Sequence, residues 1–299
     1  MTGKTMVRGL RSALTMTCAL LGAIAATSAM AGVPYVGGDY IPAPPGTKVV
    51  LFYGQWANAR GLYRDDRNVN PDARLDTHLA IIRLVRFTEL VGMPFNYQLL
   101  QPLVSAEAGG SVKALGHSGG LGDTIVSATL WPVADAKRGT YIGISPYLFV
   151  PVGDYDRNRG INFGENRWKA VMQVGGSQRV TKHIVAELGA DVTFFGRNTR
   201  FDGSRTLSQR ASFSAIGHLR YLIDDKNEFN VRAIHTIGGS TRIDGVASGA
   251  QSHGWSALAT YRRTLPHQMQ LMVQGGRDLS IDNGFRERAR VQVRLLKAF

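Results

Sequence analysis

Apolar and polar residues alternate along the C-terminal end of the chain, from Phe285 to Phe299. Every second residue here is mostly apolar, including Val291, Val293 and Leu295, and most residues between them are polar or basic. A repeat of two residues is the period of a β-strand, whose successive side chains point to opposite faces. The segment therefore predicts a strand with one apolar face and one basic face.

The same alternation recurs along most of the sequence. It is clear between Ile184 and Phe194, where Ile, Ala, Leu, Ala, Val and Phe share one face, and again over 210–221. Further stretches with strand character are 47–57, 75–88, 93–104, 123–132, 140–151, 168–180, 229–238, 254–264 and 268–276. With the C-terminal segment these make about twelve strands, each close to the 9–11 residues with which a tilted strand crosses a bilayer.

The connections between these stretches alternate in length. Short ones fall near 89–92, 133–139, 181–183, 224–228 and 265–267, and longer ones near 58–74, 105–122, 152–167, 195–206, 239–253 and 277–284. Antiparallel membrane barrels have short periplasmic turns and longer extracellular loops. The pattern predicts an all-β fold: a transmembrane antiparallel up-and-down β-barrel of about twelve strands over 47–299. The alternative is a soluble β-sandwich, which has no reason to alternate its loop lengths.

Composition agrees with a barrel. The chain is 44% hydrophobic with a mean hydropathy of −0.09, and no apolar run after residue 31 approaches the length of a transmembrane helix. Only alternate residues of a barrel strand face lipid, so the average hydropathy stays low. One predicted strand fits less simply, because Arg83 and Arg86 lie on opposite faces of 75–88. One of these arginines must reach toward a membrane interface, or a bulge must shift the register.

The first 31 residues have the composition of an export signal. They carry three cations and no acid, then an apolar stretch over 13–27, then Ala29-Met30-Ala31. This order is typical of a cleavable secretory signal peptide, with cleavage near Ala31/Gly32. The only cysteine, Cys18, lies inside it, so we expect a mature chain without thiols. The prediction is an exported protein that resides in the bacterial outer membrane.

A short segment separates this signal from the first strand. Residues 32–46, GVPYVGGDYIPAPPG, are rich in proline, glycine and tyrosine, which favours an extended, non-helical course. Two interpretations stay open. The segment is either a periplasmic leader or a plug that folds into the barrel and closes it.

The polar faces of the strands predict which side chains line the interior. If Val291 and Val293 face lipid, the four arginines of the last strand face inward, as do polar residues on the two other clear strands. The predicted lumen-facing residues are Glu187, Asp191, Arg210, His218, Arg220, Arg286, Arg288, Arg290 and Arg294. A basic wall attracts anions in a confined space. Alternatively these charges pair across a narrow barrel and fill it.

One motif suggests an enzyme. Gly116-His117-Ser118-Gly119-Gly120 fits G-x-S-x-G, the turn that presents a nucleophilic serine between a strand and a helix. No helix is expected after Ser118, because β-branched residues follow and Trp131-Pro132 ends the segment. The seven histidines are scattered without metal-ligand spacing, and no nucleotide-binding motif is present. We expect no catalytic, metal-binding or cofactor-binding residues, and a lipid hydrolase stays a remote alternative.

Charge does not point to nucleic acid either. The net charge is +13, but the arginines alternate within strands and the lysines are dispersed. Nucleic-acid-binding proteins gather their basic residues into a patch or a helix. We expect instead that cations near strand ends contact the anionic head groups of outer-membrane lipid and lipopolysaccharide.

Several phrases resemble the MetA-pathway phenol-degradation family of outer-membrane transporters. They are the Pro/Gly segment and first strand at 37–63, the second hairpin at 83–103, GGLGDTIVSATLWP at 119–132, and YLFVPVGDYDRNRGINFGENRWKAVMQVGG at 147–176. The usual threonine of the family's proline–threonine–glycine sequence is Val152 here. The resemblance covers most of the chain after residue 31, and it implies an outer-membrane barrel that moves aromatic or other hydrophobic small molecules.

The sequence thus predicts an outer-membrane channel that admits small hydrophobic or aromatic compounds. The runner-up is a structural or adhesive barrel with a filled interior and no transport. The last residue adds one partner, because an amphipathic last strand that ends on Phe299 resembles the assembly signal of bacterial outer-membrane barrels. We therefore expect the barrel assembly machinery to bind this strand.

Overall fold

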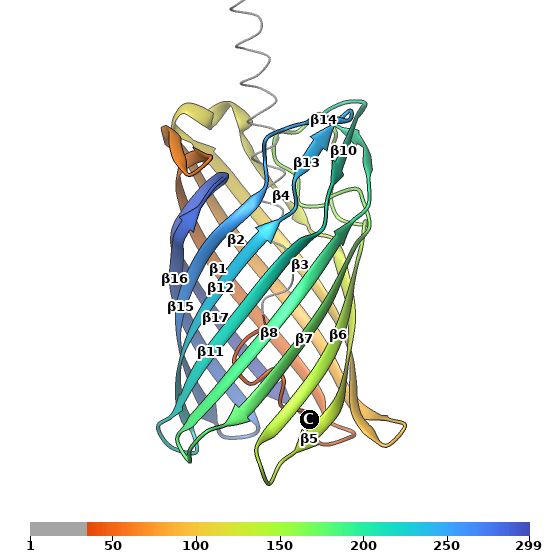
Figure 1. The fold of residues 1–299 in the computed structure, drawn as a ribbon, viewed down its shortest axis with the longest axis vertical. Helices are drawn as coiled ribbons and strands as arrows, with labels where there is room; N and C mark the ends of the chain where they lie inside the picture. Colours follow the sequence, from red (N-terminus) through yellow and green to blue (C-terminus); the bar gives the residue numbers. More distant parts are fainter. Residues whose placement is uncertain (1–34) are drawn as a thin grey trace, which may run out of the picture.

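Twelve long antiparallel strands close into a barrel in the computed structural model, which describes residues 35–299 (Figure 1). The predicted signal peptide at 1–31 lies outside the described residues. The barrel strands are β1 (Lys48–Arg64), β2 (Arg67–Leu90), β3 (Met93–Gly109), β5 (Thr124–Asp135), β6 (Thr140–Val150), β7 (Lys169–Arg179), β8 (Ile184–Phe195), β11 (Ser212–Leu222), β12 (Asn227–Gly238), β15 (Ser252–Leu265), β16 (Met269–Ile281) and β17 (Gly284–Ala298).

Each barrel strand pairs with its neighbours in the chain, and the last strand pairs with the first. The register of β1 with β17 runs from Val49 opposite Ala298 to Tyr63 opposite Gly284. Closure leaves the barrel without an edge strand, so the backbone groups within it find partners across the sheet. The predicted fold class, an up-and-down barrel of twelve strands, is therefore confirmed.

The alternation in sequence becomes an alternation between the outside and the inside of the barrel. On β17, Val291, Val293 and Leu295 are 37–46% exposed, whereas Arg294 between them is 2% exposed. Apolar side chains on the outer face suit a lipid environment, and polar side chains can be paired inside. No helix in the described part of the chain is long and apolar enough to cross a membrane.

The short connections lie together at one end of the barrel. They span 91–92, 136–139, 180–183, 223–226 and 266–268, and the ends of the barrel sequence lie at the same end (Figure 1). In outer-membrane barrels this is the periplasmic end. The opposite end carries the long connections.

The prediction of a long loop is wrong for two of the connections, because the strands continue through them. Strand β1 runs to Arg64 and β2 begins at Arg67, so only Asp65 and Asp66 form the turn. Both aspartates have positive φ, 48° and 61°, as a two-residue hairpin turn requires. Over 277–284 only residues 282–283 separate β16 from β17.

The other long connections contain small elements of their own. A four-stranded sheet joins β9 (Asn198–Phe201) and β10 (Arg205–Gln209) to β13 (Thr241–Ile243) and β14 (Val246–Ala247). A 3-10 helix, η1 (Gly110–Leu115), leads into β4 (His117–Leu121), which pairs with β3. These elements lie at the end with the long connections (Figure 1).

The two arginines of opposite parity on β2 are accommodated without a bulge. The register of β1 with β2 is regular from Lys48 to Arg60. Arg83 points inward and bonds Gln98, whereas Arg86 is exposed and lies opposite Lys48, the first residue of β1. Arg86 therefore sits close to the membrane interface, where a long cationic side chain can reach water.

Candidate functional site

Residues 35–46 cross the interior of the barrel before β1 begins (Figure 1). Tyr35 and Tyr40 are 3% and 2% exposed, so each is enclosed by the barrel wall and by its neighbours. Their rings meet edge to face, with centroids 4.8 Å apart. The segment also has backbone contacts with side chains of β5, β8, β12 and β15. The candidate site is the surface on which this segment lies, called here the interior site.

Three glycines on neighbouring strands make room for the two tyrosines. Gly143 of β6 lies opposite Gly175 of β7, which lies opposite Gly189 of β8. A Cβ on Gly143 would lie 2.7 Å from Cδ1 of Tyr40, and one on Gly189 would lie 2.5 Å from Cε1 of Tyr35. A Cβ on Gly175 would overlap the ring of Tyr40. This glycine row therefore forms a flat patch that two aromatic rings can approach.

The next inward-facing row of the same strands is polar. Ser145 of β6 lies opposite Gln173 of β7, which lies opposite Asp191 of β8. The hydroxyl of Tyr40 donates to Oε1 of Gln173 at 3.0 Å and contacts Oγ of Ser145 at 3.4 Å. The amide Nε2 of Gln173 donates to Oδ2 of Asp191 at 3.4 Å. Because a carboxylate only accepts, this bond turns the amide oxygen toward Tyr40.

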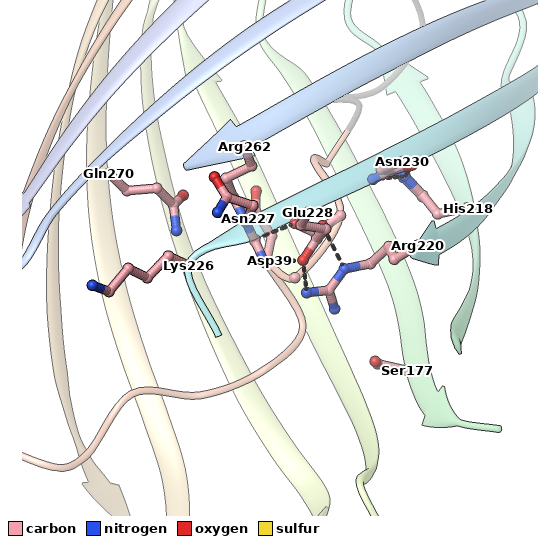
Figure 2. Close-up of polar contacts among 12 residues, drawn as sticks. Asp39, Ser177, His218, Arg220, Lys226, Asn227, Glu228, Asn230, Arg262 and Gln270 are labelled. Carbon is pink, nitrogen blue, oxygen red and sulfur yellow. Dashed lines mark hydrogen bonds and ion pairs between the residues drawn. The ribbon is translucent and has the colours of Figure 1, made fainter. Parts of the chain in front are cut away.

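Ion pairs of the barrel wall hold the segment at Gly38. Arg220 of β11 contacts Glu187 of β8 at 2.7 Å and Glu228 of β12 at 2.6 Å. Glu228 also pairs with Arg262 of β15, as Figure 2 shows. The backbone N–H of Gly38 donates to both oxygens of Glu187, at 3.0 and 3.1 Å. This chain of four charges thus spans four neighbouring strands and reaches the segment.

Asp39 gives the segment a second electrostatic anchor. Its carboxylate contacts Arg83 of β2 and Arg294 of β17, each at 3.3 Å. Arg294 also donates to Oε1 of Gln270 at 2.6 Å. The side chains of Arg83 and Arg294 are 14% and 2% exposed, so these pairs are poorly screened by water. One aspartate thus links the segment to strands on both sides of β1.

The start of the segment contacts β11 and β12. Arg232 donates to the carbonyl of Tyr35 at 2.9 Å. The ring of His218 lies 4.8 Å from that of Tyr35, and its Nδ1 lies 3.3 Å from Oδ1 of Asn230. On the other side of the segment, Nε1 of Trp131 donates to the carbonyl of Tyr40 at 2.9 Å.

Five of the residues predicted to face the lumen meet around this segment. They are Glu187, Asp191, His218, Arg220 and Arg294, and each is at most 5% exposed. Sequence reasoning did not select the other members of the site. Arg232 and Arg262 could have been found, because each lies on the polar face of its strand as Arg220 does. The alignment of the three glycines depends on strand register, so no single strand shows it in its sequence.

The other four predicted residues are placed differently, and Arg290 is the one of the four that is buried, at 8% exposure. Arg290 contacts Glu287 at 2.7 Å, and Arg286 is half-buried and bonds the carbonyl of Leu279. Arg288 is exposed and is the residue skipped where β17 shifts its register against β1. Arg210 is exposed and lies between β10 and β11. The bulge explains why Glu287 and Arg290, three residues apart, share a face.

The family follows from the sequence match. A family described as "Putative MetA-pathway of phenol degradation" matches residues 48–295. The chain belongs to this family. The match spans the whole barrel except its last few residues, which confirms the resemblance found in the sequence.

Solved structures agree with this assignment. An outer membrane channel from Pseudomonas putida F1 is 28% identical, covers 89% of this chain and 100% of its own, and has a TM-score of 0.86. The transport unit of the autotransporter AIDA-I from Escherichia coli covers 93% of this chain and 97% of its own, with 8% identity and a TM-score of 0.54, and it shows the fold alone. No relative was found among curated proteins. The fold and the family together identify an outer-membrane β-barrel of the channel type.

Two motifs that carry the family resemblance, Gly122-Asp123 and Gly153-Asp154, contact each other at the barrel end that holds the long connections. Asp154 accepts from the N–H of Leu121 at 2.6 Å. Asp123 accepts from the N–H of Gly153 at 3.0 Å and from the N–H of Glu165 at 2.9 Å. These bonds join the start of β5 to the connection between β6 and β7. The motif residues therefore shape the loops and take no part in the interior site.

Glu165 anchors the far end of the same loop. It contacts Arg167 at 2.6 Å and Lys169 at 2.5 Å. Burial alone raises the pKa of this carboxyl, but the charges of Lys169 and Arg167 and their hydrogen bonds outweigh it and lower the pKa to about 2. Glu165 is therefore ionised at neutral pH and keeps the loop attached to β7.

Ser118 does not occupy the turn that a nucleophile needs. It lies in β4, opposite Ala106 of β3, within a stretch predicted to be loop. The short strand is followed by β5, so no helix begins after the serine. Within residues 35–299 no group of three or more His, Cys, Asp or Glu residues is placed to hold a metal ion.

Proposed function

We propose that this protein is a channel for small hydrophobic or aromatic compounds and that residues 35–46 form a movable plug in it. The observation that carries the proposal is the position of Tyr35 and Tyr40, which fill the glycine row inside the barrel by non-covalent contacts alone. Membership of the phenol-degradation family and similarity to an outer membrane channel support the channel class.

The plug has the features of a part that can leave. It is held by ion pairs, hydrogen bonds and two aromatic rings, and its C-terminal end continues into β1 of the barrel wall. Gly46, just before β1, has a φ of +90° and has no atom within 4 Å of the position of a Cβ. A residue with that freedom can absorb the rotation of a hinge. The three prolines between Tyr40 and Gly46 keep the rest of the segment extended.

Most charges of the interior are paired while the plug is docked. Arg220 and Arg262 are neutralised by Glu187 and Glu228, and Arg83 and Arg294 share Asp39. While the plug is docked, the attraction for anions that a purely basic wall would exert is therefore mostly offset. With the plug displaced, the surface beneath Tyr35 and Tyr40 would consist of the glycine row, Ile216 and a few amide and hydroxyl groups. Such a surface suits a small aromatic molecule. The arginines that contact the plug, Arg83, Arg232 and Arg294, would line other parts of the interior.

Uptake by proteoliposomes tests the channel and the plug together. The wild-type protein and a variant lacking residues 35–45 are compared, with benzyl alcohol as the solute and empty liposomes as the blank. We expect uptake by the wild type and several-fold faster uptake by the deletion variant. Equal uptake by the two proteins would contradict the plug, and uptake no faster than the blank by either would contradict the channel.

The alternative is a structural or adhesive barrel whose interior is filled permanently. The buried ion-pair chain from Glu187 to Arg262 is the observation that favours it, because such a network resists rearrangement. Under this alternative the deletion variant conducts but the wild type never does. Planar bilayer recordings of the wild type at rising solute concentration separate the two, since a movable plug produces opening events.

Several further features belong to the same proposal. We infer that the N-terminal signal directs export, that the barrel assembly machinery reads Phe299, and that surface cations contact lipid and lipopolysaccharide. Phe299 is 66% exposed and its backbone pairs with Lys48, which closes the barrel. We assign neither nucleic acid as a partner nor catalysis to the protein. If the purified protein had phospholipase activity and Ser118→Ala lost it, the protein would be an enzyme and this expectation would be wrong.

A further inference from the structure

We propose that the place occupied by Tyr40 is a binding site for neutral phenols, and that Tyr40 is an internal ligand which a free phenol displaces. The side chain of tyrosine is itself a para-substituted phenol. Its surroundings in the barrel therefore describe what the site recognises. The inference rests on the proposed plug, and it adds the chemical class of the solute and the position at which it binds.

The ring of Tyr40 has a surface that fits an aromatic molecule. One side lies over Gly143 and Gly175, where any larger side chain would collide with it. The edge of Tyr35 meets it at 89°, and Ile216 and Ile234 complete the apolar cluster. Glycines at these positions are costly within strands, because they contribute no side chain to packing. Their alignment with Gly189 across three strands is explained by the close approach of two flat rings, because Tyr40 lies over Gly143 and Gly175 and Tyr35 lies over Gly189.

The hydroxyl of Tyr40 lies against acceptors that are fixed in orientation. Oε1 of Gln173 accepts from it at 3.0 Å, while Nε2 of the same amide is held by Asp191. Ser145, the other contact of the hydroxyl, lies 2.8 Å from Oγ1 of Thr129. A site built this way favours a molecule that carries a hydroxyl donor over the same ring without one, because the amide oxygen of Gln173 then loses its donor at 3.0 Å and keeps the longer contact with the hydroxyl of Tyr147 at 3.5 Å.

The same geometry selects against aromatic carboxylates. Asp191 is 5% exposed and lies directly beside Gln173 in the polar row. A second carboxylate at the position of the Tyr40 hydroxyl would meet this negative charge at short range in a poorly screened interior. Neutral phenols are thus favoured over benzoates of the same size.

Displacement of an internal ligand couples binding to opening. A phenol can occupy the site only after Tyr40 has left it, so binding favours the released plug by the difference in affinity between the two states. A tethered group has an effective concentration on the order of millimolar. A free phenol therefore has to reach a comparable concentration to compete, which makes the plug responsive to an abundant solute.

The binding of free aromatic molecules to a variant that lacks the Tyr40 side chain tests the site without any transport measurement. In the full-length protein in detergent, Tyr40→Ala removes the internal ligand, and the dissociation constants of p-cresol and toluene are measured from the shift in melting temperature. Tyr35→Ala is the matched control, because the hydroxyl that it removes has no hydrogen-bond partner within the described residues. The toluene-to-p-cresol ratio of dissociation constants should be about five- to tenfold larger for Tyr40→Ala than for Tyr35→Ala.

The result that overturns the proposal is an equal ratio in the two variants. A second substitution localises the effect: in Tyr40→Ala combined with Gln173→Leu, the ratio should fall to that of the Tyr35→Ala control. An unchanged ratio in the double variant would place the donor preference elsewhere and also contradict the site.

A milder variant keeps the proposal testable if Tyr40→Ala does not fold. Tyr40→Phe retains the ring and loses only the donor, so p-cresol should displace it at a concentration about five- to tenfold lower than it displaces Tyr40. A cysteine at Val36, which is 6% exposed, reports displacement by its maleimide labelling in a Cys18→Ser background. Equal concentrations for the two proteins would overturn the proposal. Binding and labelling are both independent of uptake, so they can fail while the channel itself is sound.

Discussion

Gly175 lies so close to Tyr40 that the ring of Tyr40 fits only because Gly175 has no side chain. The ideal Cβ position of Gly175 overlaps the ring of Tyr40, although the two residues lie on separate parts of the chain. Gly175 belongs to β7 in the barrel wall, and Tyr40 belongs to the segment that crosses the interior. The docked position of the segment therefore depends on the absence of one methyl group in the wall.

Adding that methyl group should expel the plug. In Gly175→Ala we expect Tyr40 to lose its place and uptake through the barrel to rise several-fold, approaching that of the variant lacking residues 35–45. Liposome swelling measures the rate. Gly217→Ala is the control, because the nearest atom to a Cβ there, on Leu188, lies at 3.7 Å, an ordinary contact distance. Unchanged uptake in Gly175→Ala, with a properly folded barrel, contradicts the docked plug.

Removing the central cation of the interior should destabilise the protein strongly. Arg220→Met leaves Glu187 and Glu228, each at most 5% exposed, without their shared partner. Breaking a buried pair in this way costs about 3–5 kcal/mol. Urea unfolding followed by heat-modifiable gel mobility gives the change in free energy.

The comparison for this prediction is a more exposed pair. In Arg60→Met the loss should stay below about 1 kcal/mol, since the side chains of Arg60 and Asp76 are 35% and 37% exposed. Similar losses in Arg220→Met and Arg60→Met would indicate that the interior pair is open to water.

Neutralising the anchor of the plug should change ion selectivity. Asp39→Asn leaves Arg83 and Arg294 without a shared carboxylate, so the segment is held less firmly and the interior becomes more positive. We expect more frequent opening and a shift of the reversal potential toward anion selectivity in a KCl gradient. Asp72→Asn, which loses an exposed pair with Arg74, should behave like the wild type. If the two variants have the same reversal potential, Asp39 does not control the path of ions.

The loop anchored by Glu165 should detach in acid. The pKa of Glu165 in the folded protein, about 2, lies below its ordinary value of 4.5. Its stabilising contribution is therefore complete above pH 4.5 and is lost as the pH falls toward 2. Pepsin, which is active across this range, should cleave within 152–167 only near the lower limit.

A substitution separates this effect from general acid unfolding. In Glu165→Gln the ion pairs with Arg167 and Lys169 are absent at every pH, so cleavage of the loop should occur at pH 4.5 as readily as at pH 2.5. Resistance of this variant at pH 4.5 would mean that the loop is held by the bonds of Asp123 and Asp154 alone.

The barrel itself was predictable from the local alternation of apolar and polar residues. The two-residue period in segments such as 184–194 and 285–299 is a property of neighbouring residues, because each strand must present apolar side chains to lipid and polar ones to the interior. For the same reason the five short turns and the order of strands were predictable. Pattern failed at 58–74, where polar residues beyond the membrane resemble a loop although they form a hairpin on Asp65 and Asp66.

By itself, then, the sequence determined the strands, their order and the face on which residues such as Glu187 and Arg220 lie. Only the tertiary structure decided which of these residues meet. The pairing register sets Gly143, Gly175 and Gly189 side by side, and a bulge removes Arg288 from the row of Arg290. The position of Tyr40 depends on strands more than one hundred residues away, since Gly143 and Gly175 both contact it. Contacts at that separation arise from register and closure, which no local pattern records.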